Sequence, residues 1–204
     1  MIVYVESNFI LELAYLQEEY KSCEEILELV QESQITLVLP VYSVGEPYDS
    51  WVRRSKQRLD LHERLSRELI ELSRSKPYVE TLTDFQEITK ILVESGEKEK
   101  EELDNTISKV LKTATIIPID REVIKAAIGF QKTRNLSPQD SIVYASVLSH
   151  LSGTSTEEQK CFITKNSKDF ANPDIYTDLE AYCCKLLTKF VNGVGYTKKC
   201  LKII

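Results

Sequence analysis

Residues 2–8 read Ile-Val-Tyr-Val-Glu-Ser-Asn, a short apolar run followed at once by one acidic and two polar residues. A β-branched run of this kind predicts a buried strand, and Ser7 or Asn8 is placed to cap the helix that follows it. Apolar residues then recur at helical spacing as far as about Ser33. The chain therefore opens with a strand, an acid at its end and a helix.

Further segments share the apolar character of this first strand, and they lie at 35–39, 115–119, 161–164 and 185–191. The intervening patterns are helical over 43–75, over 78–113 with an interruption around Ser95-Gly96, over 120–132, from Ser137-Pro138 onward, and over 176–183. Apolar strands that alternate with helices are typical of a parallel sheet covered on both faces. We therefore predict an α/β protein, a three-layer α/β/α fold with a central parallel sheet of about five strands.

The size and composition of the chain indicate one domain. Its 204 residues are 42% hydrophobic and 28% charged, and they contain no repeat or Pro/Gly/Ser-rich linker. We expect a single domain over 1–204, with the helical block at about 51–113 projecting as an extended arm. The absence of a membrane-length apolar run or a signal-peptide pattern leads us to expect a cytoplasmic protein with no membrane partner.

Acidic residues follow several of the predicted strands. Glu6 comes directly after the first strand, Glu46 soon after the second, and Asp140 in the first turn of the helix opened by Pro138, while Asn166 and Asp169 follow the fourth strand. The carboxyl ends of parallel strands meet at one edge of the sheet, where ligands bind. Because clustered carboxylates repel, a divalent cation is the simplest partner, and oxygen ligands favour Mg²⁺ or Mn²⁺.

Each of these acids also has a purely structural interpretation. Glu46 and Asp140 stand where an acid favours the helix dipole, and Asp169 is suited to a turn. Other chemistries find less support, since the chain lacks the nucleotide-binding patterns G-x-G-x-x-G and G-x-x-x-x-G-K-[ST] and any Ser/His/Asp arrangement.

The order of these features resembles a PIN domain. The resemblance rests on the opening strand with its acid, on Ser-Pro-Gln-Asp-Ser-Ile-Val-Tyr-Ala-Ser at 137–146, and on Ile-Thr-Lys-Asn-Ser-Lys-Asp-Phe at 163–170. It covers about 1–50 and 114–190. PIN domains are typically metal-dependent ribonucleases, and many are toxins of bacterial toxin–antitoxin pairs.

The resemblance implies a role for each matching residue. Glu6, Glu46, Asp140 and Asp169 would be catalytic, with Glu6, Asp140 and Asp169 as metal ligands and Ser7, Asn166 and Thr164 as accompanying polar residues. The family normally opens with Asp, whereas Glu6 is one methylene longer, a change expected either to weaken the activity or to favour a more permissive ion such as Mn²⁺. The implied activity is hydrolysis of RNA by a metal-dependent endoribonuclease.

The net charge of −6 is unevenly distributed and does not exclude an RNA partner. Cations suited to RNA lie in two places, Arg53 and Arg54 on the helix after Glu46, and Lys185, Lys198 and Lys199 near the C-terminus. Either group is also explained as a solvated face, and the C-terminal group equally suits an acidic partner. Other expected partners are an antitoxin or another protein, and a second copy of the chain.

Two alternatives to a nuclease stay open. The first alternative is a catalytically inactive PIN-like module that binds RNA or protein. The second is an unrelated doubly wound domain whose acids only cap helices. Convergence of the carboxyl groups of Glu6, Glu46, Asp140 and Asp169 would argue against the last.

Overall fold

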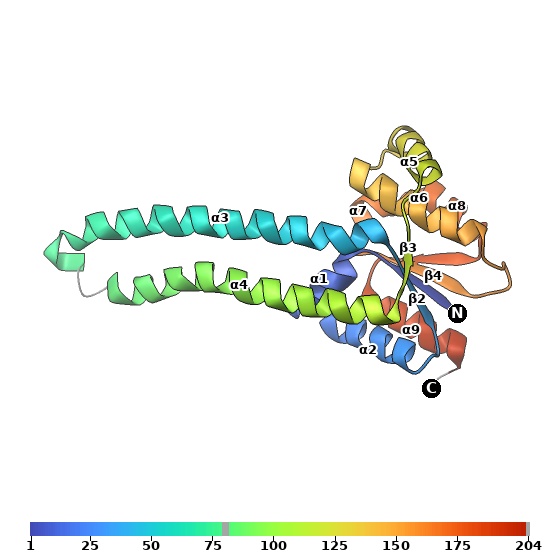
Figure 1. The fold of residues 1–204 in the computed structure, drawn as a ribbon, viewed down its shortest axis with the longest axis horizontal. Helices are drawn as coiled ribbons and strands as arrows, with labels where there is room; N and C mark the ends of the chain where they lie inside the picture. Colours follow the sequence, from blue (N-terminus) through green and yellow to red (C-terminus); the bar gives the residue numbers. More distant parts are fainter. Residues whose placement is uncertain (79–81, 203–204) are drawn as a thin grey trace.

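The computed structural model describes residues 1–78 and 82–202, with the side chains of 82–84 and 86–88 left out. The elements follow one another as β1 (Ile2–Val5), α1 (Ser7–Tyr15), α2 (Tyr20–Gln31), β2 (Thr36–Pro40), α3 (Val41–Ser73), η1 (Lys76–Tyr78), α4 (Leu82–Thr113), β3 (Thr115–Ile117), α5 (Arg121–Thr133), α6 (Pro138–Ser152), β4 (Lys160–Ile163), α7 (Ser167–Phe170), α8 (Pro173–Glu180), β5 (Cys184–Leu187) and α9 (Phe190–Leu201). Figure 1 shows their arrangement in space.

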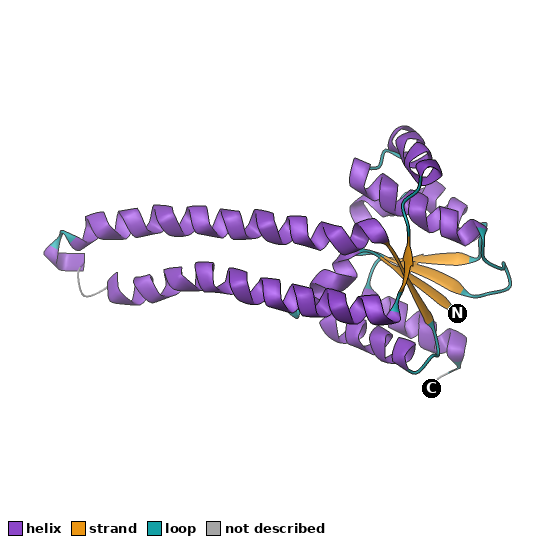
Figure 2. Cartoon of the chain, viewed as in Figure 1, coloured by secondary structure: helices purple, strands orange, loops and turns teal. Residues whose placement is uncertain are grey.

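The strands form one parallel sheet in the order β3-β2-β1-β4-β5. β1 lies at its centre, with Val3 aligned between Leu37 of β2 and Cys161 of β4. All strands run in the same direction, so their carboxyl ends gather at one edge (Figure 2). The predicted five-stranded parallel sheet is confirmed.

Side chains of β1 alternate between two hydrophobic cores, one on each face of the sheet. Val3 and Val5 join a cluster with residues of α1, α2, α4 and α9. Ile2 and Tyr4 join a second cluster with residues of α6, α7 and α8. Figure 1 shows these helices as layers on the two sides of the sheet, so the predicted α/β/α architecture is also confirmed.

Helices α3 and α4 pair as a long hairpin that projects from the sheet as an arm (Figure 1). The expected interruption at Ser95-Gly96 is wrong, because α4 continues through it. Gly96 is buried and lies against Ser55, and its carbonyl oxygen accepts a hydrogen bond of 2.8 Å from Trp51 Nε1. The start of the helix expected at 78 falls partly on 79–81, outside the described residues.

The end of the chain differs most from the sequence prediction. The strand expected at 185–191 covers only the residues of β5, and α9 begins at Phe190. Phe190 and Val194 are four residues apart, so they lie on the same side of a helix and enter the core together. Gly193 lets this helix approach β4 closely, because a Cβ atom there would lie 2.3 Å from Ile163 Cδ1.

Smaller differences concern element ends. β3 ends at Ile117 rather than at 119, and the helix expected over 176–183 is α8, which begins and ends about three residues earlier. Among the described residues, none of the helices combines the length and hydrophobicity that a membrane span requires.

Candidate active site

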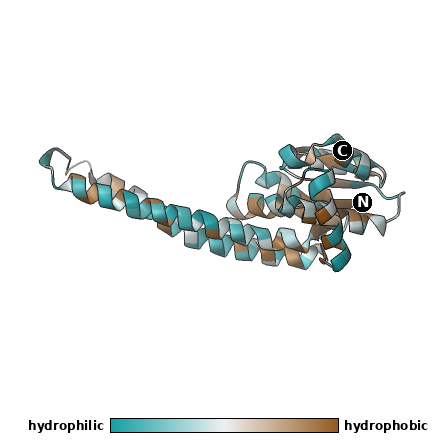
Figure 3. Cartoon of the chain, turned by 90° about the horizontal axis from the view of Figure 1, so that it is seen from above, coloured by the Kyte–Doolittle hydropathy of each residue, from teal (hydrophilic) through white to brown (hydrophobic). Residues whose placement is uncertain are grey.

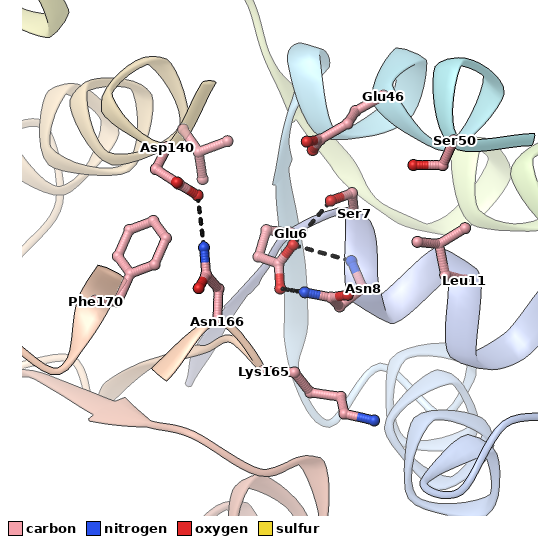
Figure 4. A pocket seen from close by; sticks show the side chains of 11 residues that line it. Glu6, Ser7, Asn8, Leu11, Glu46, Ser50, Asp140, Lys165, Asn166 and Phe170 are labelled. Carbon is pink, nitrogen blue, oxygen red and sulfur yellow. Dashed lines mark hydrogen bonds between the residues drawn. The ribbon is translucent and has the colours of Figure 1, made fainter. Parts of the chain in front are cut away.

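A polar cavity of about 310 Å³ opens at the carboxyl edge of the sheet. Its walls come from the residues that follow β1 and β4, from the N-terminal parts of α1, α3 and α6, and from Phe170 of α7 (Figure 4). The lining side chains are Glu6, Ser7, Asn8, Leu11, Glu46, Ser50, Asp140, Val143, Lys165, Asn166 and Phe170.

Glu6 lies at the junction of β1 and α1, where its carboxylate caps the helix. One oxygen, Oε2, accepts hydrogen bonds of 2.9 Å from both Ser7 Oγ and the Asn8 backbone N–H, and Oε1 accepts one of 2.7 Å from Asn8 Nδ2. The residue is only 5% exposed. Burial raises the pKa of Glu6, the hydrogen bonds from Asn8 and Ser7 oppose this, and the charge of Glu46 adds to the rise.

Glu46 reaches the cavity from the second turn of α3, which begins directly after β2. Tyr42 stands one helical turn earlier on α3 and was not singled out from the sequence. Burial raises the pKa of Tyr42, and the negative charges of Glu46, Asp49 and Asp140 raise it further. The phenol therefore lies within the electrostatic reach of two of the acids that line the cavity.

Asp140 occupies the first turn of α6, and two neighbours hold its carboxylate. Ser137 caps the helix and donates from Oγ to Asp140 Oδ2 over 2.5 Å, and Asn166 Nδ2 donates to Oδ1 over 3.0 Å. Burial raises the pKa of Asp140, these hydrogen bonds oppose it, and the charge of Asp169 adds to it. Asn166 is itself fixed by a hydrogen bond of 3.0 Å from its backbone N–H to Oγ1 of the fully buried Thr164.

The family model described as a PIN domain matches residues 3–170. The chain belongs to the PIN domain family. The matched span holds every element that lines the cavity, and it includes the arm. No curated protein and no solved structure matches the chain. PIN domains are generally nucleases, and they typically use divalent metal ions.

The PIN domain brings together most of the acids singled out from the sequence. Glu6, Glu46 and Asp140 line one cavity, accompanied by Ser7 and Asn166. Asp169 stands on the short helix α7, outside the cavity lining, and acts on Asp140 through its charge. Thr164 lies behind Asn166 and supports it.

The expected RNA-binding cations lie at different distances from this cavity of the PIN domain. Arg53 is exposed on α3, two turns beyond Glu46, and Arg54 lies over the ring of Tyr15 at 5.6 Å. Lys185 and Lys199 line a separate hollow beside α9 and β5, which is the edge strand next to β4. Lys198 forms an ion pair with Glu25.

Lys165 is the cation in the cavity lining, and sequence reasoning gave it no role. Its Nζ forms ion pairs with Glu12 and, at 3.2 Å, with Glu18. Glu12 is almost completely buried on α1 and also accepts a hydrogen bond from the Glu19 backbone N–H. The charge of Lys165 is thus already shared by two other carboxylates. Only its place inside the 163–170 motif pointed to it.

The donors of the cavity fit a hard divalent cation in chemical type, since they are carboxylate, amide and hydroxyl oxygens. Within the described ranges, however, no three Asp, Glu, His or Cys side chains are grouped closely enough to hold one ion. Burial is the main cause of the raised pKa values of Glu6 and Asp140, and the negative charges of Glu46 and Asp169 add to the rise. The cavity of the PIN domain therefore offers oxygen ligands of a suitable chemical type, but it does not group three of its carboxylates closely.

Proposed function

We propose that this PIN domain is an endoribonuclease that hydrolyses RNA phosphodiester bonds and depends on Mg²⁺ or Mn²⁺. The convergence of Glu6, Glu46 and Asp140 on one cavity carries the proposal. These carboxylates come from three separate parts of the chain, and capping a helix gives them no reason to face one another. PIN domains are generally nucleases, which agrees with this chemistry.

Glu6, Glu46 and Asp140 would hold the metal after side-chain rotations that bring their carboxylates closer together than they lie in this structure, with Asp169 supporting Asp140 from α7. When bound, the ion would activate water and stabilise the charge that develops on the phosphate. The chain's own contribution is positioning. Asn8 and Ser7 fix the orientation of the Glu6 carboxylate, and Asn166 and Ser137 fix that of Asp140. Arg53, exposed two turns beyond Glu46, is suited to contact the RNA backbone.

The test is Asp140→Asn, compared with Asp174→Asn as a matched control. Both positions lie in the first turn of a helix that begins with Pro, but Asp174 is on α8, outside the cavity. We expect Asp140→Asn to weaken Mn²⁺ binding, measured by calorimetry, by at least about tenfold. Cleavage of labelled RNA should fall in parallel, while Asp174→Asn behaves like the wild type.

A second candidate is a catalytically inactive module that binds RNA or protein. It is favoured by one observation, that the Glu6 carboxylate is already engaged by Ser7 and Asn8 as a helix cap. Wild-type protein that binds RNA but neither binds Mn²⁺ nor cleaves RNA would support this candidate and overturn the first.

As biological setting we propose a toxin whose nuclease activity is masked by an antitoxin that covers the acidic cavity. Expression of the wild type should then arrest growth of a bacterial host, and expression of Asp140→Asn should not. Equal growth of the two strains, with both proteins present at the same level, would argue against the toxin role while leaving the nuclease proposal untouched.

A further inference from the structure

The arm exposes large apolar side chains along its length. On α3, Val52, Leu59 and Ile70 are 54%, 46% and 58% exposed, and on α4 Ile91 is 62% exposed. Figure 3 shows apolar residues spread among the polar ones along the whole hairpin. Single exposed apolar residues are ordinary, but a repeated series on one projecting element marks a surface that another molecule covers.

The exposed residues of α3 form two stripes. Val52, Leu59 and Ile70 are separated by seven and eleven residues, which return to the same side of a helix. A second set, spaced by four and seven residues, consists of Leu61, Leu65 and Leu72. The two sets lie on nearly opposite sides of α3, because residues 59 and 61 are about 200° apart around a helix. A pair of helices needs only one apolar seam, so an exposed stripe in addition to the side that faces α4 suits a bundle of more than two helices.

The seam between α3 and α4 is partly polar, in contrast to these outer stripes. Arg58 Nη2 donates to Glu99 Oε1 over 2.7 Å, and its Nη1 donates to Ser95 Oγ over 3.1 Å. Further along, His62 Nδ1 lies 3.0 Å from the carbonyl oxygen of Thr89. Polar groups thus occupy inner positions of the arm while apolar groups face outward, so the hairpin alone does not bury its own apolar surface.

The charges of the arm indicate what covers it. Residues 53–76 carry eight Lys or Arg against four Asp or Glu, and residues 77–104 carry three Lys against nine Asp or Glu. An α3 helix placed beside α4 of a second copy brings opposite charges together, whereas α3 beside α3 brings like charges together. An RNA is a poor occupant, because the returning half of the arm is acidic and the stripes are apolar.

We propose that a second copy of this chain covers the arm, so that two hairpins form a four-helix bundle in which α3 and α4 helices alternate. A two-fold axis relates the copies, and each arm offers the same surface to the other. The dimer places its contacts on the arms and leaves both cavities at the sheet edges. This inference is independent of the proposed nuclease activity.

Sedimentation of the full-length chain tests the proposal. We expect the wild type to sediment as a dimer at micromolar concentration and Leu59→Glu to raise the dimer dissociation constant at least tenfold. Gln57→Glu is the matched control, because it adds the same charge at an exposed position on the same helix. Circular dichroism checks that both variants keep their helical content.

A charge-reversed variant tests the alternation of helices. Glu94 and Glu101 are exposed on α4, and replacing both by Lys should weaken the dimer because α4 would then repel α3 of the partner copy. A wild type that stays monomeric at 100 μM, on the order of the dissociation constant of a weak specific dimer, overturns the proposal. The same result is expected if a different protein covers the stripes. A dimer that Leu59→Glu leaves intact, or that Gln57→Glu disrupts equally, overturns it as well.

Discussion

The carboxylates of Glu6 and Asp140 are oriented in the cavity at a cost in folding stability. Each receives hydrogen bonds that fix its direction, yet burial raises the pKa of both. A folded chain with such groups holds its protons to a higher pH than the unfolded chain does. Their stabilising contribution is therefore present below the pKa values of the unfolded chain, and it is lost as the pH rises through the raised values of the folded chain.

This sign can be measured on the metal-free protein. In EDTA, the free energy of unfolding of the wild type should fall between about pH 4 and pH 7 more than that of Asp140→Asn, which lacks one of the two titrations. Urea denaturation at several pH values provides the comparison, with Asp174→Asn following the wild type. Parallel curves for wild type and Asp140→Asn would show that burial does not perturb Asp140 in this way.

Lys165 offers a second prediction for a single side chain. Lys165→Ala leaves the buried carboxylate of Glu12 without its cation and frees the loop that carries Asn166. Because Lys165 is partly exposed, we expect a loss of about 1–3 kcal/mol in the free energy of unfolding. Lys168→Ala, at an exposed position on α7, should change it by less than about 0.5 kcal/mol.

A double variant separates the ion pair from other effects of removing Lys165. Glu12→Gln removes the buried charge, so adding it to Lys165→Ala should recover much of the lost stability. If Lys165→Ala is as stable as Lys168→Ala, the ion pair between Lys165 and Glu12 contributes nothing to the free energy of unfolding.

Among the helices and strands, the contact between α9 and β4 depends on a missing side chain. Gly193→Ala would place a methyl group 2.3 Å from Ile163 Cδ1, so we expect a loss of about 1–3 kcal/mol in unfolding free energy. Gly195→Ala lies on the same helix with nothing within 4 Å of the added atom, and it should stabilise by about 0.5–1 kcal/mol. Thermal or urea unfolding distinguishes the two variants.

Ile163→Val removes the atom that the new methyl group would meet. Combined with Gly193→Ala, it should therefore destabilise by less than the two single changes together. Strict additivity would mean that α9 shifts away from β4 instead of pressing against this side chain.

The strands were predictable where apolar runs are short and end in polar residues. β1 and β4 fit this description, and β2 is a similar apolar run that ends at Pro40, because buried parallel strands are apolar on both faces. α9 was missed because Phe190 and Val191 follow soon after the apolar Leu186 and Leu187 and look like a continuation of β5. Only the packing of Phe190 and Val194 against the same core reveals the helix.

The candidate site was predictable to the extent that it follows from topology. Glu6, Glu46 and Asp140 meet because each follows a strand or opens a helix at one sheet edge. The place of Asp169 outside the lining depends on how the four-residue helix α7 turns, and that orientation is set by packing of Phe170. The role of Lys165 could not be predicted because it depends on the ion pair with Glu12, which lies more than 150 positions away in the sequence.

For the molecule as a whole, the sheet and the outer part of the arm should be separable. The arm's base packs on the core through Leu103, Ile107 and Val110, whereas its outer part contacts only its own partner helix within the described residues. We expect that replacing residues 63–88 by a four-residue Gly/Ser linker keeps the fold and the Mn²⁺ affinity of the cavity. A four-residue linker is long enough, because His62 Nδ1 lies 3.0 Å from the carbonyl oxygen of Thr89.

Circular dichroism and calorimetry check this shortened chain. Its melting temperature should stay within about 5 °C of that of the monomeric Leu59→Glu variant, because the buried cores are unchanged. An unfolded shortened chain would show that the outer arm is required for the sheet to form.

The position of the arm between β2 and β3 also bears on how the chain folds. These neighbouring strands pair with Pro40 opposite Ile117, yet residues 41–114 separate them in the sequence. Closing a flexible loop of that length costs about 4 kcal/mol in chain entropy. A helical hairpin that forms by successive local contacts toward its base brings the end of β2 close to the start of β3, where Val38 pairs with Thr115. We therefore expect the arm to lower the entropic cost of pairing β2 with β3, because its short-range contacts form before these two distant strands meet.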